Sequence, residues 1–195
     1  MRVAARAFAL ALLMLAGCAE RDLWPVERLD PKTAVNVTIM AEPWVYARSV
    51  PMLAANARDY LNVGIVETNR SGTRAYWLGV VSWSTIDRSV YAANGARAMP
   101  VRIRLGWPTM KLELVPATAG RSTAGLSAPV FTEGATSFDE SWYPLSTDEV
   151  AQLGIGAPTA VSLIDEAGEL ASYDAWHADP TVMVDFLKAT GLDRP

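Results

Sequence analysis

The stretch from residue 61 to residue 86 constrains the fold more than any other part of the chain. Residues 61–68 place Leu61, Val63 and Ile65 on one face and predict a strand. Residues 69–72 (Asn-Arg-Ser-Gly) have the composition of a turn. The return strand, residues 73–86, carries apolar side chains on both faces. Because a surface strand would alternate, we expect a central hairpin with other structure packed on each side.

The same alternation predicts five further strands, at residues 34–40, 101–105, 110–115, 160–165 and 169–176. The second and third of these would form a hairpin closed by a four-residue loop. That loop would set Ile103 opposite Leu112 and Arg102 opposite Glu113, with the apolar pair buried and the ion pair exposed. The last two strands would form another hairpin.

Three helices are predicted from spacing and end signals. Residues 49–60 have apolar side chains about one helical turn apart and indicate a short helix. Residues 146–149 (Ser-Thr-Asp-Glu) form a capping box that would begin a helix reaching Leu153. Asp179 and Pro180 indicate the beginning of a last helix, which Gly191 would end.

These elements predict an α+β fold, built mainly from antiparallel β-hairpins with about seven strands and two or three peripheral helices. A β-sandwich with helical additions is the alternative. Residues 116–136 are rich in small residues and would form a long surface loop. We expect one globular domain over residues 34–195, preceded by a polar tether at residues 18–33.

The first residues have the layout of a secretory signal. Arg2 and Arg6 precede an apolar run at residues 8–14, which is too short to cross a bilayer core of roughly 30 Å. Residues 15–18 (Leu-Ala-Gly-Cys) resemble the lipobox of bacterial lipoproteins. The resemblance covers only this leader. It implies that residues 1–17 are a signal peptide and that Cys18 carries the lipid that anchors the mature chain in a membrane of the cell envelope.

The residue after the cysteine bears on which membrane is meant. By resemblance to enteric sorting rules, an aspartate there would retain a lipoprotein in the inner membrane. This chain has Ala19 instead. The resemblance therefore implies the outer membrane, with the domain facing the periplasm.

Composition excludes several classes of function. The chain has 17 basic and 21 acidic residues, and loss of Arg2 and Arg6 with the leader would leave 15 basic residues. An acidic protein without a basic cluster is not expected to bind nucleic acid. Cys18 is the only cysteine, so neither an intramolecular disulfide nor a thiolate metal cluster can form.

The sequence offers no cofactor-binding motif, no metal-binding motif and no catalytic motif. His177 is the only histidine, and no Gly-x-Ser-x-Gly segment accompanies it. Asp139 and Glu140 lie among aromatic residues, a setting found in sugar-cleaving enzymes. A cell-envelope hydrolase would require these two carboxylates or His177 to converge in one cleft.

The tryptophans are the remaining indication of a binding surface. Three of the seven tryptophans, Trp44, Trp142 and Trp176, lie in less regular stretches and could rim a groove for a partner. We therefore expect a membrane-anchored envelope lipoprotein, with a non-catalytic domain that is structural or contacts another envelope protein. The alternative is a lipid-anchored module that binds a small ligand or a glycan.

Overall fold

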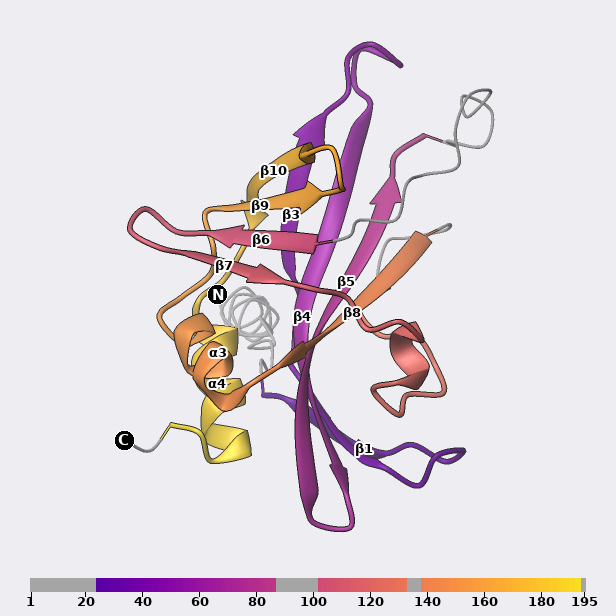
Figure 1. Cartoon of the computed structure of the whole chain (residues 1–195), viewed down its shortest axis with the longest axis vertical. Helices are drawn as coiled ribbons and strands as arrows, with labels where there is room; N and C mark the ends of the chain where they lie inside the picture. The colour runs from indigo at the N-terminus through magenta and orange to yellow at the C-terminus, as the bar shows by residue number, and fades with distance from the viewer. Residues whose placement is uncertain (1–23, 87–101, 133–137, 194–195) are drawn as a thin grey trace, which may run out of the picture.

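A computed structural model describes residues 24–86, 102–132 and 138–193 of the chain (Figure 1). The expected signal peptide, Cys18 and the first residue of the strand expected at 101–105 lie outside these residues. Within the described part of the chain, no helix has the length and apolar character needed to span a membrane.

The expected central hairpin is confirmed and is the longest feature of the molecule (Figure 1). It consists of β4 (Arg58–Arg70) and β5 (Thr73–Ser84), which are antiparallel throughout. Ser71 and Gly72 have φ angles of 52° and 90°, and the Gly72 amide donates to the Asn69 side chain over 2.9 Å. The turn therefore uses the left-handed conformation that a tight hairpin requires.

The other strands add to both sides of this hairpin. β8 (Phe138–Leu145) pairs with β5. The opposite edge of β4 is shared, because β3 (Trp44–Ser49) pairs with its first half and β2 (Asn36–Ile39) pairs with its second half. β1 (Val26–Leu29) extends the sheet beyond β2.

The sheet continues from β3 through the C-terminal hairpin. β10 (Glu169–His177) pairs with β3, β9 (Ala160–Ile164) with β10, β6 (Arg102–Gly106) with β9, and β7 (Lys111–Leu114) with β6. All ten described strands thus belong to one antiparallel sheet. The two strands at the ends of its longest path, β1 and β7, are not paired with each other. Just beyond β7, however, the Ala117 amide donates to the Trp142 carbonyl of β8 over 2.7 Å.

Two short helices lie together beside the sheet (Figure 1). α3 (Thr147–Leu153) begins with the expected capping box between Ser146 and Glu149. α4 (Thr181–Thr190) ends at Gly191, whose φ of 71° is the left-handed cap expected there. The fold is therefore mainly antiparallel β with helical additions, as predicted in outline. Its ten described strands exceed the seven expected.

The prediction of a helix at residues 49–60 is wrong. These residues end β3, form the connection to β4 and begin β4. The Val50 amide donates to the Ala57 carbonyl over 2.9 Å, so the backbone bonds across the hairpin instead of along a helix. Met52, expected on the apolar face of that helix, is 96% exposed at the tip.

The hairpin of β6 and β7 is confirmed, but its expected register is wrong by two residues. Ile103 pairs with Leu114, and Arg104 pairs with Glu113. The ladder extends to Gly106, and the Trp107 amide donates to the Met110 carbonyl, so the turn is tighter than the expected loop. A shift of two keeps every side chain on its expected face. The apolar pairs are therefore still buried.

Three strands were not expected. β1 lies within the stretch expected to be a tether, so the tether can extend only to the residue before Val26. β3 overlaps the beginning of the expected helix. β8 carries Pro144 and three polar residues in sequence, and the sequence offers no clear period there. Each of these strands is set by pairing with β2, β4 or β5, not by its own alternation.

The core fills both faces of the central hairpin, as the sequence predicts. One face carries Leu61, Val63 and Ile65, all with 0% exposure. The other face is covered in part by the long loop at residues 115–132, whose Phe131 ring lies on Gly64. The loop is therefore a packing layer with buried side chains and not only a surface connection.

Candidate binding surface

The structure separates the three candidate tryptophans. Trp44 and Trp142 are both 0% exposed, whereas Trp176 is 57% exposed. The Trp44 indole NH donates to the Asp179 carbonyl over 2.9 Å, at the beginning of α4. Trp142 lies against Gly79 of the neighbouring strand. The expected rim of three tryptophans is therefore not formed, because two of them pack in the core.

Trp176 is held at the surface by two neighbours from β4. It lies at an irregularity in β10, where the pairing with β3 shifts between Ala175 and His177. The Arg58 guanidinium lies 4.7 Å from the centre of its ring. The Tyr60 ring meets it edge-on, with centroids 6.2 Å apart and an interplanar angle of 86°. Cation–π and edge contacts of this kind fix an exposed ring in one orientation.

A second tryptophan extends the cluster onto β5. Tyr60 and Trp83 are directly opposite in the β4–β5 ladder, and their rings stack with centroids 4.3 Å apart. The Trp83 indole NH donates to the Asn62 side chain over 3.1 Å. The buried Asn62 amide in turn donates to the Phe131 carbonyl over 2.8 Å. The half-buried rings are thus tied to the central hairpin and to the long loop.

We call Arg58, Tyr60, Trp83 and Trp176 the aromatic patch. The sequence indicated only Trp176, because Tyr60 fell in the expected helix and Trp83 fell in the return strand, which was expected to be packed on both faces. The signal was present, however. A turn centred on Ser71 and Gly72 pairs residues whose numbers add to 143, which places Tyr60 opposite Trp83. The strand expected at residues 61–68 began one residue too late to include Tyr60.

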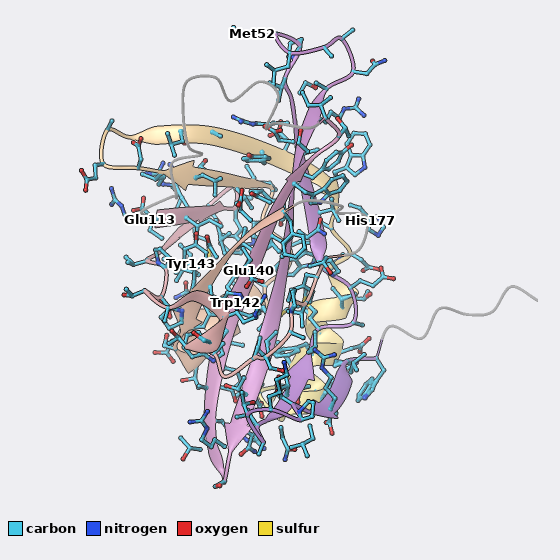
Figure 2. The ribbon with its side chains drawn as sticks, turned by 90° about the vertical axis from the view of Figure 1, so that its right-hand side faces the viewer. Met52, Glu113, Glu140, Trp142, Tyr143 and His177 are labelled. Atoms are coloured by element: carbon cyan, nitrogen blue, oxygen red, sulfur yellow. The ribbon has the colours of Figure 1, made fainter. Side chains whose placement is uncertain are left out.

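The candidate acid residues do not converge. Asp139 and Glu140 are consecutive in β8, so their side chains point to opposite faces. Glu140 makes an ion pair of 2.7 Å with Arg121. His177 lies in β10, and three strands separate β10 from β8, which corresponds to roughly 19 Å measured along the sheet. Figure 2 shows His177 and Glu140 at separate places on the molecule.

His177 has surroundings typical of a surface residue. Its side chain is 64% exposed, and its Nε2 lies 3.9 Å from a Glu42 carboxylate oxygen. Among the described residues, no group of three metal-ligating side chains is arranged to hold an ion. The described part of the chain thus does not assemble the cleft that a hydrolase would require.

The perturbed ionisable groups outside the patch have structural causes. Burial raises the pKa of Tyr143 to about 12. Burial also raises the pKa of the Glu67 carboxyl, which Arg74 opposes from 3.6 Å. Hydrogen bonds from the hydroxyl and the amide of Thr181 lower the pKa of Asp179 at the beginning of α4. These groups come from different elements and do not form a reactive set.

Comparisons of the chain with protein-family models, with curated proteins and with solved structures found no match. Function must therefore be inferred from the chain's own residues.

Proposed function

We propose that this chain is a lipid-anchored protein of the bacterial cell envelope, facing the periplasm from the outer membrane. Its domain works as a non-catalytic module that binds another envelope protein. The lipobox-like residues 15–18 support the anchor at Cys18. The aromatic patch is the observation that supports the binding role.

The patch has the composition of an interface hot spot. Tryptophan, tyrosine and arginine are the residue types most enriched among residues that contribute strongly to protein–protein affinity. Here all three types contact one another on one surface, and a hydrogen bond to Asn62 holds the Trp83 ring in place. A rigid patch loses little side-chain entropy when a partner binds.

The chemistry of the patch favours a protein over a glycan. A sugar ring binds by stacking on an open aromatic face. Arg58 already covers one face of Trp176, and Tyr60 and Trp83 stack on each other. Arg58 makes no ion pair with any described residue, so its guanidinium is available to a carboxylate of the partner.

Site-specific photo-crosslinking in intact cells tests this role. A photoreactive residue at position 176 should give one discrete protein adduct, because the partner covers the patch. Arg58→Ala should weaken that adduct about tenfold or more, which corresponds to a hot-spot loss of over 1 kcal/mol.

Leu170 provides the matched control, because it lies on the same strand and is 43% exposed. The same photoreactive residue at position 170 should not give the adduct. An equal yield of protein adduct at both positions, or a yield that Arg58→Ala does not change, would refute the binding role of the patch. An adduct with glycan at position 176 would favour the alternative module.

A further inference from the structure

The first described strand exposes apolar side chains in an unusual concentration. Trp24, Val26 and Leu29 are 51%, 52% and 59% exposed, and they lie within six consecutive residues. All four side chains of β1 are exposed. Among the strands that the structure describes, β1 pairs only with β2 and is therefore an edge of the sheet. A soluble domain normally avoids apolar side chains on an open edge strand, so this edge calls for an explanation.

The position of this edge along the chain indicates what covers its exposed apolar side chains. Only five residues lie between Cys18 and Trp24, which makes six residue steps along the chain. Fully extended, that length spans at most about 20 Å. If Cys18 carries a lipid, as the proposed function holds, Trp24 cannot move farther than this from the bilayer surface, and β1 begins only two residues later. We propose that β1 and Trp24 form a docking surface for the bilayer itself, so that the domain rests on the membrane by this edge.

The side chains of this surface suit the interfacial region of a bilayer. Tryptophan is favoured there because its ring is apolar and its NH is polar. Arg28 and Lys32 are exposed and can reach lipid phosphates, while Glu27 offsets part of their charge. The contact is therefore mainly apolar, and moderate salt should change it little.

The open backbone edge limits the depth of contact. The outward NH and carbonyl groups of an edge strand need hydrogen-bond partners, which the hydrocarbon core does not offer. Water and headgroups supply them at the interface. The edge should thus lie at headgroup depth and not deeper.

A docking surface with weak affinity for the bilayer is sufficient, because the lipid anchor already keeps the domain at the membrane. A lipid on Cys18 confines the edge near the bilayer, and a short tether raises the effective concentration of a second contact to the millimolar range. Three partly inserted side chains need only hold the domain's orientation. The docking surface and the aromatic patch are separate features, because β2 joins the second half of β4 and Tyr60 lies near its first residue.

Fluorescence quenching in vesicles tests this proposal on the full lipoprotein. Acylation would consume the thiol of Cys18, so Leu29→Cys would introduce the only free thiol, to be labelled with an environment-sensitive dye. Met52→Cys is the matched control, because Met52 is apolar and exposed at the end of the molecule farthest from β1 (Figures 1 and 2). The labelled proteins are reconstituted in phosphatidylethanolamine–phosphatidylglycerol vesicles that contain a lipid with a headgroup nitroxide.

The label at position 29 should be quenched several-fold more than the label at position 52. Equal, weak quenching at both positions would refute the docking surface. A label at position 29 that is shielded from water but not quenched by the nitroxide lipid would also refute it, since a protein then covers the edge. Mass spectrometry of the same samples reports acylation. If Cys18 is acylated, these two negative results leave the anchor intact, whereas an unmodified Cys18 would overturn both proposals.

Discussion

Two paired glycines decide how the central hairpin packs. Gly64 and Gly79 are opposite each other in β4 and β5. The Phe131 ring lies on Gly64, and a Cβ built on Gly79 would be 2.9 Å from the Trp142 ring. Glycine inside a strand often marks such a close approach. The two rings can therefore approach the sheet closely, and Trp142 is buried instead of lining a groove.

Gly64→Ala should destabilise the protein for this reason. Its Cβ would overlap the Phe131 ring, so the long loop would have to shift. Overpacking of this kind typically lowers the free energy of unfolding by about 1–3 kcal/mol. Urea denaturation measures the loss.

Gly106→Ala is the control for this experiment. A Cβ at Gly106 would have its nearest neighbour, the Ala160 carbonyl oxygen, at 3.6 Å. It should change the free energy of unfolding by no more than about 0.5 kcal/mol. Equal stability of the two variants would contradict the packing described.

The burial of the three candidate tryptophans could not be predicted from residue type alone. Trp44, Trp142 and Trp176 look alike in sequence because each lies in a stretch without clear alternation. Their burial depends on long-range neighbours: Trp44 bonds to the residue before Pro180, and Trp142 meets Gly79. Nothing local to a tryptophan encodes such contacts. The sequence therefore identified one patch residue of four.

At the scale of elements, the predictions that rest on residues close in sequence are confirmed. Strands that depend on pairing with distant parts of the chain were not predicted. The β4–β5 hairpin, the capping box of α3 and the Gly191 end of α4 each depend on residues close in sequence. β1, β3 and β8 depend on strands that lie elsewhere in the chain. The apolar spacing of residues 49–60 fits a helix as well as it fits a hairpin, and only the partner strand decides between them.

The turn between β1 and β2 illustrates such a long-range link. The buried Asp30 carboxylate accepts hydrogen bonds from the amides of Lys32 and Thr33 and from the Ser127 amide, over 3.0, 3.1 and 2.7 Å. These bonds, that from Ser127 foremost, hold the pKa of Asp30 well below its usual range. One side chain therefore joins the β1–β2 turn to the long loop.

The stabilising effect of Asp30 should depend on pH. The lowered pKa means that the folded state favours the charged carboxylate. Its contribution is thus complete above the ordinary aspartate pKa of about 3.9 and is lost as the pH falls towards the lower folded value. Asp30→Asn should lower Tm by several degrees at neutral pH, and this difference should shrink as the pH falls below about 4.

Thermal unfolding followed by circular dichroism measures the difference. Glu166→Gln, at an exposed turn residue, serves as the control and should leave Tm nearly unchanged at every pH. If Asp30→Asn lowers Tm equally at neutral and acid pH, the carboxylate is not the group that stabilises this turn.

At the scale of the whole molecule, β4 separates two surfaces. β1 is joined through β2 to residues 66–69 of β4, whereas Tyr60 of the aromatic patch lies near its beginning. Six to nine residues of strand correspond to roughly 20–30 Å. With β1 on the bilayer, the patch would face a partner in the space beyond the membrane surface. The protein would then hold that partner at a fixed distance from the membrane.

The anchor at Cys18 is the central claim of this account, because both surfaces acquire their roles from it. Intact-mass and peptide mass spectrometry of the protein purified from its native membranes tests the anchor most directly. We predict a mature chain that lacks residues 1–17 and begins at an acylated Cys18. A chain that retains those residues, or that begins elsewhere with an unmodified Cys18 thiol, would contradict the claim.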